Sequence, residues 1–223
     1  MLEGKSVVIT GATGSLGRAA IEAVLLERGE PILISRQFAD DFYSDLPRYE
    51  IDLTEHDATQ AVISRIGDFD AVFNIAGGFA MGKKVYDDDR DDWSSMFALN
   101  TETMRNVAKV AIPLLIQRGG GAMVNVGAYA AQSGKADMGA YVASKAAVMR
   151  LTETLSEEVR EHGVNVNAVL PTIIDTPANR NGMPDADPKS WVDPTRLAQV
   201  MCFLASDAAQ DIHGALLPVR ALS

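Results

Sequence analysis

The chain of 223 residues is poor in cysteine and in basic side chains. Cys202 is the only cysteine, so neither an intrachain disulfide nor a cysteine-based zinc site can form. It lies in an apolar stretch, which predicts a buried thiol. Lys and Arg number 20 against 30 Asp and Glu, a formal net charge of −10. Nucleic acids and anionic membranes bind basic surfaces, so we expect neither as a partner, whereas a small-molecule substrate needs only a local site.

Long apolar runs and histidine clusters are missing as well. No segment approaches the roughly 20 apolar residues of a membrane helix, and residues 1–6 lead into a strand without a signal-peptide core. We therefore expect a cytoplasmic protein. His56, His162 and His213 have no ligand spacing. The acidic run 87–92 is typical of a solvated loop whose carboxylates cap the helix that follows, so the sequence predicts no metal site.

Short β-branched runs alternate with helical patterns along the chain. The predicted strands are residues 7–10, 31–35, 49–51, 70–75, 122–126, 164–170 and 215–219. The predicted helices are residues 16–26, 56–66, 93–117, 140–161 and 194–205. Strands that are apolar throughout are buried on both faces, and strands separated by helices pair in parallel. We predict one α/β domain over residues 1–223, a doubly wound parallel sheet (Rossmann fold) of about seven strands with helices on both faces.

Glycines mark the ends of predicted helices, and one connection is unusually long. Gly29, Gly119 and Gly163 each follow a helical pattern and are expected to end it. Residues 171–193 are rich in Pro, Asn and Asp, and connections of this length commonly act as lids or binding loops. We predict a substrate lid there.

A glycine-rich turn, residues 10–18, follows the first predicted strand. Its glycines would let the backbone approach a pyrophosphate, which the N–H groups and positive dipole of the next helix would hold. The spacing is G-x-x-G-x-x-G rather than the G-x-G-x-x-G dinucleotide fingerprint, so a tight turn without a ligand is the alternative. Its position after the first strand of a doubly wound sheet favours a dinucleotide. The predicted cofactor residues here are Gly11, Thr13, Gly14, Ser15, Leu16 and Gly17.

The residues after the second predicted strand indicate which dinucleotide binds. An acidic residue at this point would bind a free ribose hydroxyl. Ser35 and Arg36 stand there instead, and no carboxylate occurs before Asp40. A hydroxyl and a guanidinium suit a 2′-phosphate, which favours NADP(H) over NAD(H). A solvent-facing loop arginine is the alternative.

Tyr141 and Lys145 stand one turn apart in the helix predicted over 140–161. An ammonium near a phenol favours the phenolate, so it lowers the tyrosine pKa and lets the phenol donate or accept a substrate proton. Such pairs are common on solvated helix faces. The dinucleotide turn in the same chain is what gives this pair its weight.

These residues form a larger set, and the chain resembles the short-chain dehydrogenase/reductase family over essentially its whole length. The matching motifs are residues 10–17, Asn74-Ile75-Ala76-Gly77, Asn100, Tyr141-x-x-x-Lys145 and 171–176. The resemblance implies that Tyr141 is the catalytic acid/base. It implies that Lys145 binds the nicotinamide ribose and lowers the tyrosine pKa, and that Asn100 supports a proton-relay water.

The resemblance also implies further cofactor contacts and an oligomer. The residues that would brace the sheet beside the adenine ribose are Asn74, Ala76 and Gly77. Those that would border the adenine are Asp52 and Leu53. Those on the carboxamide and phosphate side would be Pro171, Ile173 and Thr176. A homodimer or homotetramer is implied, with contacts through residues 100–117 and 141–161.

The glycine turn is shifted by one position from the commonest members, and Ala128 is a second departure. The family carries a hydroxyl-bearing residue 13 positions before the tyrosine, where it holds the substrate oxygen. The dihydropteridine reductases work without that serine, and the chain resembles them in residues 76–80, 127–131 and 170–191. That branch favours NADH, whereas Arg36 favours NADPH, and both choices stay open.

Together these residues predict a reductase that transfers hydride from NAD(P)H to a small polar substrate, either dihydropteridine-like or a carbonyl compound. The alternative is a dinucleotide-binding sensor or scaffold with little turnover, because losing an oxyanion donor costs ~10²–10³ in rate. The retained pair of Tyr141 and Lys145 favours the enzyme.

Overall fold

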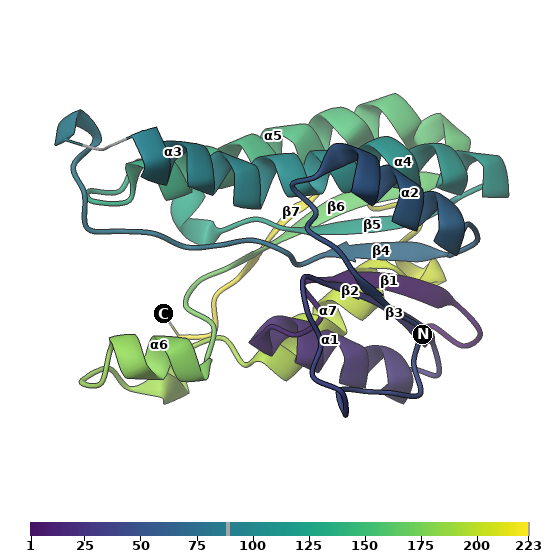
Figure 1. The fold of residues 1–223 in the computed structure, drawn as a ribbon, viewed down its shortest axis with the longest axis horizontal. Coiled ribbons are helices and arrows are strands. Elements are labelled where there is room, and N and C mark those ends of the chain that lie inside the picture. The colour runs from purple at the N-terminus through teal and green to yellow at the C-terminus, as the bar shows by residue number, and fades with distance from the viewer. Residues whose placement is uncertain (88–89, 223) are drawn as a thin grey trace.

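The computed structural model describes residues 1–87 and 90–222. Within them, seven strands form one sheet in the order β3-β2-β1-β4-β5-β6-β7 (Figure 1). The strands are β1 (Ser6–Thr10), β2 (Glu30–Ser35), β3 (Arg48–Glu50), β4 (Ala71–Asn74), β5 (Gly121–Val126), β6 (Val164–Pro171) and β7 (Leu216–Val219). Every neighbouring pair is parallel. The predicted single-domain Rossmann-type fold is confirmed.

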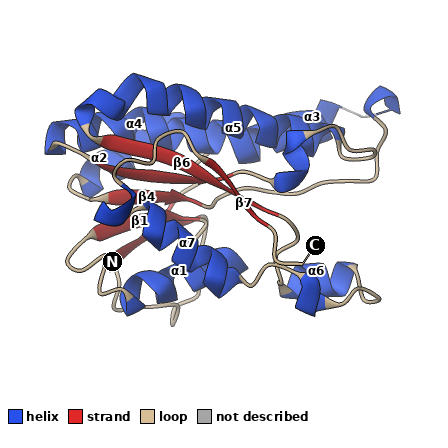
Figure 2. Ribbon diagram, turned by 180° about the vertical axis from the view of Figure 1, so that it is seen from behind, coloured by secondary structure: helices blue, strands red, loops and turns tan. Residues whose placement is uncertain are grey.

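Helices cover both faces of the sheet, as Figures 1 and 2 show from opposite sides. The α-helices are α1 (Ser15–Leu26), α2 (His56–Ile66), α3 (Arg90–Met96), α4 (Thr103–Arg118), α5 (Gly139–Val159), α6 (Pro177–Gly182) and α7 (Pro194–Leu204). Short 3₁₀ turns occupy residues 85–87, 129–132, 160–162, 188–190 and 207–209. Helices α2, α4 and α5 lie on one face, and α1 and α7 lie on the other.

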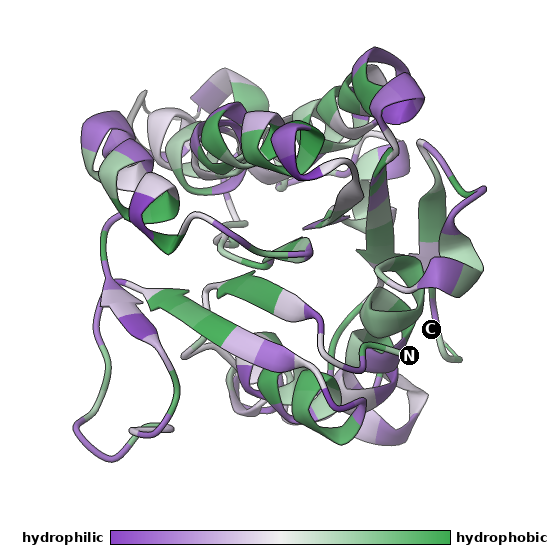
Figure 3. Ribbon diagram, turned by 90° about the vertical axis from the view of Figure 1, so that its right-hand side faces the viewer, coloured by the Kyte–Doolittle hydropathy of each residue, from purple (hydrophilic) through white to green (hydrophobic). Residues whose placement is uncertain are grey.

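Each face of the sheet has its own apolar core. Val7 and Ile9 of β1 pack with α1 and α7, whereas Val8 between them packs with α2, α4 and α5. Figure 3 shows apolar strands between the two helical layers. Successive strand residues point to opposite faces, so burial of both sets explains why the strands are apolar throughout. Cys202 lies buried in the first core, as predicted.

The winding of the sheet reverses between β1 and β4, which are hydrogen-bonded neighbours. Open α/β sheets bind ligands outside the carboxyl ends of their strands at such a switch point. The glycine turn leaves the sheet after β1 at Thr10, and residues 75–78 leave it after β4 at Asn74. The fold therefore brings together two of the motifs found in the sequence.

The helix predicted over residues 93–117 is interrupted. Helix α3 passes into a π-helical segment, Phe97–Glu102, before α4 continues to Arg118. A π-helical turn inserts an additional residue, and such turns occur frequently at functional sites. Asn100 lies in this segment with only 1% of its surface exposed. The helix predicted as continuous over residues 93–117 is therefore divided at Phe97–Glu102.

Two of the three predicted helix-ending glycines are confirmed. Gly119 (φ 97°) and Gly163 (φ 71°) adopt the left-handed conformation that ends a helix. The prediction for Gly29 is wrong, because the left-handed residue after α1 is Arg28 (φ 63°). Gly29 has a packing role instead: a Cβ there would lie 2.8 Å from Cγ1 of Val24.

Residues 171–193, which we call the arm, fold into more than a loop. They contain α6 and the 3₁₀ turn Pro188–Ser190, and Figure 1 shows α6 standing apart from the sheet. Ile174 pairs with Val192 at the base of the arm, and Trp191 is buried there. The arm is thus anchored at its base, while most of α6 is exposed.

Membrane and metal features were also searched in residues 1–87 and 90–222. In this part of the chain no helix has the length and apolar character needed to cross a membrane. These residues also contain no cluster of three or more His, Cys, Asp or Glu that could hold a metal ion. The helix cap expected from the acidic run falls at residues 88–89, outside the described residues.

Candidate active site

The glycine turn after β1 packs backbone against backbone. Gly11 adopts a left-handed φ of 65°, and a Cβ there would lie 2.9 Å from the backbone nitrogen of Ala76. A Cβ on Gly17 would collide with the carbonyl oxygen of Gly11. Glycine is therefore required at both positions, for conformation at one and for space at both.

The turn ends at Gly14, the N-cap of α1. Among the described residues no side chain caps this end, and the first turn of the helix carries no acidic residue. The first N–H groups of a helix lack intrahelical partners and lie at the positive end of its dipole. An open N-terminus behind a glycine turn is a ready site for a pyrophosphate.

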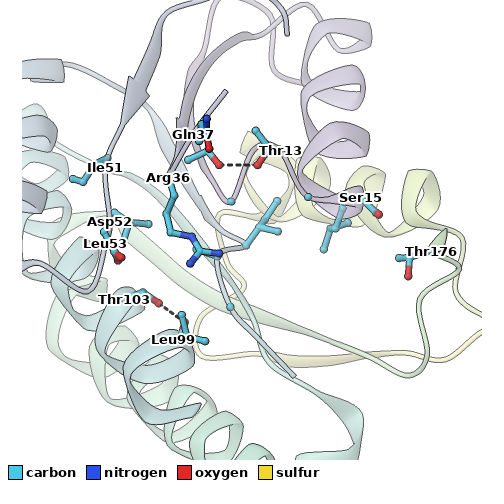
Figure 4. Close-up of a pocket in the computed structure, with 17 residues that line it drawn as sticks. Thr13, Ser15, Arg36, Gln37, Ile51, Asp52, Leu53, Leu99, Thr103 and Thr176 are labelled. Atoms are coloured by element: carbon cyan, nitrogen blue, oxygen red, sulfur yellow. Dashed lines mark hydrogen bonds between the residues drawn. The ribbon is translucent and has the colours of Figure 1, made fainter. Parts of the chain in front are cut away.

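A cavity of about 710 Å³ lies beside the turn (Figure 4). The predicted cofactor residues that line it are Gly11, Thr13, Gly14, Ser15, Leu16, Arg36, Asp52, Leu53, Ala76, Gly77 and Thr176. The lining residues that the sequence did not single out are Gln37, Ile51, Ile75, Leu99 and Thr103. Gln37, Ile51 and Ile75 are chain neighbours of predicted residues. Leu99 and Thr103 come from the interrupted helix, and only the folded chain brings them here.

Thr10 fixes the wall of the cavity behind the turn. Its Oγ1 accepts hydrogen bonds from the N–H groups of Ile75 (3.0 Å) and Ala76 (3.1 Å), so the segment after β4 is tied to the end of β1. Asn74 points elsewhere: its Nδ2 donates to Oδ1 of Asn125 on β5 at 2.9 Å. Asn74 therefore braces the sheet from inside and is not among the described residues that line the cavity.

Opposite the turn, a hydroxyl, a guanidinium and a carboxylate lie at the end of β2 and after β3. The hydroxyls of Ser35 and Thr13 are hydrogen-bonded at 2.7 Å, and Arg36 points into the cavity in Figure 4. Oδ1 of Asp52 accepts from the backbone N–H (3.0 Å) and hydroxyl (2.8 Å) of Thr54. These bonds, with a smaller contribution from Arg36, lower the pKa of Asp52. This end of the cavity thus holds a cation and an ionised carboxylate.

Tyr141 and Lys145 lie near the start of α5, on the side of Gly77. The Nζ atom of Lys145 is buried and donates to the carbonyl oxygen of Val126 at 2.8 Å. A Cβ on Gly77 would lie 3.3 Å from this Nζ atom. The Tyr141 ring is half-buried and meets the edge of Phe79, with ring centres 4.8 Å apart. The pair therefore adjoins the wall of the cavity rather than its centre.

Asn100 links that wall to α5. Its Oδ1 accepts from the N–H of Gly78 at 2.9 Å, and its Nδ2 donates to Oγ of Ser144 at 3.0 Å. The Ser144 hydroxyl donates in turn to the carbonyl oxygen of Tyr141 at 2.8 Å. The π-helical segment thus connects Asn100 to both the β4 loop and the helix that carries the tyrosine. The sequence analysis assigned Ser144 no role, because its use depends on this segment.

The electrostatics of the pair differ from the expectation. Burial raises the pKa of Tyr141 to about 12, and burial lowers the pKa of Lys145 to about 8. The expected lowering of the tyrosine pKa by Lys145 is not found in this structure. The physical reason is that desolvation disfavours the charged form of both groups, and the ammonium of Lys145 donates to Val126.

The arrangement agrees with a comparison to known families. Residues 5–187 match the family model described as short chain dehydrogenase. The chain belongs to the short-chain dehydrogenase family. This short-chain dehydrogenase is 27% identical to 3-oxoacyl-(acyl-carrier-protein) reductase FabG of Thermotoga maritima, over 98% of the chain and 97% of that protein. It is 28% identical to L-xylulose reductase of Bos taurus, over 98% and 96% respectively.

A solved structure gives the same assignment. The ligand-free aldohexose dehydrogenase of Thermoplasma acidophilum superposes with a TM-score of 0.89, at 28% identity, over 99% of this chain and 94% of that one. The relatives are named for substrates as different as an acyl carrier thioester, a ketose and an aldose. The chain is therefore an oxidoreductase of this family.

Ala128 lies at the end of β5 in this short-chain dehydrogenase, buried to 3% exposure. Its methyl group packs in a small apolar cluster to which Tyr129 and Tyr141 both attach. The sequence analysis placed the family's hydroxyl here, and the cluster has an apolar side chain in its place. The next hydroxyl-bearing residues along the chain are Tyr129, which is half-buried beside Ala128, and Ser133, which is exposed.

The remaining predicted residues divide between cavity and scaffold. Thr176 lines the cavity and also caps α6, since its Oγ1 accepts from the N–H of Asn179 at 3.1 Å. The carbonyl oxygen of Ile173 accepts from Val192 at 2.8 Å within the arm. The described residues that line the cavity do not include Gly17, Pro171 or Ile173. Their contribution is to hold the backbone on which the lining residues lie.

Proposed function

We propose that this short-chain dehydrogenase is an NADPH-dependent reductase of a small polar carbonyl or dihydropteridine-like compound. The observation that carries the proposal is the position of Gly77 between the cavity and the catalytic side chains. Gly77 lines the dinucleotide-sized cavity. A Cβ at this position would lie 2.7 Å from Oδ1 of Asn100 and 3.3 Å from Nζ of Lys145. The absence of a side chain at Gly77 would therefore let a bound cofactor come close to the catalytic groups.

The residues of the cavity fit a phosphorylated dinucleotide. The glycine turn and the open end of α1 suit the pyrophosphate, and a Cβ on Gly11 would fill the close approach to Ala76. Arg36 and Ser35 suit a 2′-phosphate, and Asp52 and Leu53 would border the adenine. NAD(H) is the second choice, since the ionised Asp52 lies at the same end. When bound, the nicotinamide ring supplies or accepts the hydride.

Tyr141 would act as the acid that protonates the substrate oxygen. Burial raises its pKa to about 12, so the phenol holds a proton throughout the neutral range, and this is the proton that reduction of a carbonyl needs. Lys145, with a pKa lowered to about 8, is mostly cationic at pH 7 and can return a proton towards the phenol. Asn100 would hold the loop at Gly78 and, through Ser144, the backbone of Tyr141.

The substrate class follows from what stands beside the acid. Phe79 and Tyr129 are aromatic and Ala128 offers no hydroxyl, so a flat polar compound would suit this side. The arm at 171–193 would close over it as a lid. Likeness to the dihydropteridine reductases supports a dihydropteridine as one member of the panel to be tried, next to simple carbonyl compounds.

A second function is a dinucleotide sensor or scaffold with little turnover. Ala128 favours it, because an absent oxyanion donor lowers the rate by ~10²–10³. The burial of Lys145 favours the enzyme, since burying a lysine is costly and a scaffold gains nothing from it.

NADPH oxidation tests the two. The purified chain is assayed with quinonoid dihydropterins, quinones, simple ketones and aldehydes, and NADPH binding is followed by its fluorescence. Turnover that disappears in Tyr141→Phe supports the reductase. Binding of NADPH without turnover of any compound supports the sensor, and failure to bind NADPH overturns both.

Assembly and location are part of the same proposal. A homodimer or homotetramer would form through α4 and α5, which the resemblance implies as contact surfaces and which lie together on one face of the sheet (Figure 1). We place the protein in the cytoplasm. A monomer in light scattering at micromolar concentration would remove the oligomer from the proposal.

A further inference from the structure

The ring of Tyr141 has two sets of apolar neighbours, which come from different parts of the chain. It packs against the small cluster around Ala128 at the end of β5. It also meets Phe79 of the segment after β4, with ring centres 4.8 Å apart and ring planes at 75°. Edge-to-face contacts between aromatic rings have a specific geometry in addition to their apolar area. The orientation of the Tyr141 ring therefore depends on Phe79 as well as on its own helix.

The backbone on both sides of Phe79 is fixed by hydrogen bonds. Before the ring, the N–H of Gly78 donates to Oδ1 of Asn100 at 2.9 Å. After it, the N–H of Gly82 donates to the carbonyl oxygen of Asp137 at 2.8 Å. Phe79 is thus presented to the tyrosine by a segment that is held at two points.

Two further contacts join this segment to the start of α5. The Nζ atom of Lys84 lies 2.6 Å from the carboxylate of Asp137, just before the helix. Lys83 and Met138, the N-cap of α5, form an isolated parallel β-bridge. The proton donor lies in the first turn of the same helix. The segment that carries Phe79 and the helix turn that carries the tyrosine are therefore tied together on either side of the ring contact.

The apolar cores do not explain the position of Phe79. Its side chain is 57% exposed and belongs to none of the three apolar clusters formed by the described residues. Single exposed apolar residues are common on protein surfaces. This one, however, makes its ring contact with the half-buried Tyr141. The contact serves the tyrosine more than it serves the core.

Ala128 makes the position of the phenol especially important. In the family pattern a hydroxyl-bearing residue at that position holds the substrate oxygen together with the tyrosine, and here only the phenol remains. A general acid has to lie within hydrogen-bond reach of the atom that it protonates. Misplacement by about 1 Å can lower a rate by ~10²-fold. With one hydroxyl in place of two, alignment depends on how firmly the Tyr141 ring is packed.

We propose that Phe79 is a positioning residue for the reaction, whose ring holds the phenol of Tyr141 in place and keeps water from it. The inference rests on the proposed function of Tyr141 as the acid. Burial raises the pKa of Tyr141 to about 12, which agrees with a shielded phenol. Loss of the Phe79 ring should therefore lower that pKa and misplace the phenol.

Fluorine NMR tests the shielding without any turnover. 3-Fluorotyrosine is incorporated in place of Tyr141, where the fluorine brings the ionisation into an accessible pH range, and its resonance is followed against pH. Phe79→Ala should lower the ionisation midpoint by about one pH unit, because water gains access to the phenol. Phe79→Tyr keeps a ring at this exposed position and should leave the midpoint unchanged.

Kinetics test the alignment. With the compound of the carbonyl and dihydropterin panel that the wild type reduces fastest, Phe79→Ala should lower kcat about tenfold and leave NADPH affinity unchanged. Phe79→Tyr should restore kcat. Met81→Ala is the control, because Met81 lies on the same segment and is 63% exposed. It removes an apolar side chain of similar size and should change neither the midpoint nor kcat.

Several results would overturn the inference. These are an unchanged midpoint in Phe79→Ala, an equal shift in Met81→Ala or Phe79→Tyr, and a kcat that Phe79→Ala leaves intact. A midpoint that shifts as expected, combined with a wild type that reduces no compound of the panel, would contradict the proposed function alone, because the fluorine measurement needs no turnover.

Discussion

The dinucleotide cavity and the expected substrate side next to it are built from different kinds of contact. Most of the dinucleotide side consists of segments that follow β1, β2, β3 and β4, and it is shaped by backbone, as the fit of Gly11 against Ala76 shows. The substrate side gathers single side chains from distant places: Phe79, Tyr129, the arm and the C-terminal segment. A site shaped by backbone, such as the dinucleotide side, tolerates few substitutions. A site shaped by side chains, such as the substrate side, can change its ligand through single substitutions.

Exposure separates the two sides as well. Phe79 (57%), Met81 (63%), Val85 (66%) and Tyr86 (89%) leave large apolar surfaces in solvent along the segment after β4. Thr10 and Asn74 at the foot of the cofactor wall are buried and hydrogen-bonded. The difference fits the comparison with relatives, which share the fold at 27–28% identity and are named for unrelated substrates.

The largest effect should come from the proton donor. Tyr141→Phe removes the phenol and keeps the ring that packs against Phe79. We expect kcat to fall by ~10²–10⁴, the usual contribution of a positioned general acid, with little change in NADPH affinity. Steady-state kinetics and fluorescence titration measure the two. A parallel loss of NADPH binding would mean that the tyrosine belongs to the dinucleotide side.

The next effect tests the backbone-built side. Gly11→Ala places a Cβ 2.9 Å from the nitrogen of Ala76 at a left-handed φ of 65°, so we expect a loss of about 1–3 kcal/mol in the free energy of unfolding and most of the NADPH affinity. Gly134→Ala is the control, because a Cβ at Gly134 meets nothing within 4 Å. Urea unfolding and NADPH titration compare them. Equal behaviour of the two variants would refute the backbone account.

The buried lysine makes stability depend on pH. The unfolded chain keeps the Lys145 proton up to the ordinary pKa of 10.5, and the folded chain releases it at about 8. Between these values the unfolded state binds more protons, so folding stability rises with pH. From pH 7.5 to 9.5 the wild type should gain about 1–2 kcal/mol relative to Lys145→Met. Denaturant unfolding at both pH values measures the difference. A wild type that loses stability relative to Lys145→Met between pH 7.5 and 9.5 would contradict the burial of the ammonium.

The smallest effect concerns the edge of the dinucleotide side, where the side chain of Arg36 rather than the backbone is expected to determine the affinity for NADPH. Arg36→Ala should weaken NADPH binding about tenfold, the lower end for a charge-assisted contact at an exposed position, and leave NADH nearly unchanged. Added salt should shrink the difference. Fluorescence titrations of both cofactors, with Arg150→Ala as the charge control, give the result. A wild-type preference for NADH would mean that the dihydropteridine reductases are the better guide here.

The sequence predicted the backbone-built side far better than the other. The glycine turn and Arg36 could be predicted because each directly follows a strand with a clear apolar run, whereas Gly77 was predicted through the family resemblance. The parallel sheet and its helices follow from the same alternation of patterns. Asn100 was found through resemblance, but the π-helical segment that orients it leaves no periodic signal.

The substrate side escaped prediction for a physical reason. Arg220 and Tyr129 are 91 positions apart and meet only because β5, β6 and β7 lie side by side. The expected lowering of the Tyr141 pKa is not found, because residue spacing indicates proximity to Lys145 and says nothing of desolvation, which raises this pKa. Gly29 was misread because a glycine selected for packing looks the same in sequence as one selected for a left-handed turn.

The central claim is that a cofactor in the cavity and the phenol of Tyr141, on the other side of Gly77, take part in one reaction. Transfer of deuterium from NADPH labelled at the nicotinamide C4 tests this most directly, with the panel of ketones, aldehydes and quinonoid dihydropterins and mass spectrometry of the products. We predict one deuterium on the reduced atom of a product formed by the wild type, and formation of that product ~10²–10⁴ times more slowly by Tyr141→Phe. Tight binding of the labelled cofactor with no labelled product from any compound would contradict the claim and leave a dinucleotide-binding protein.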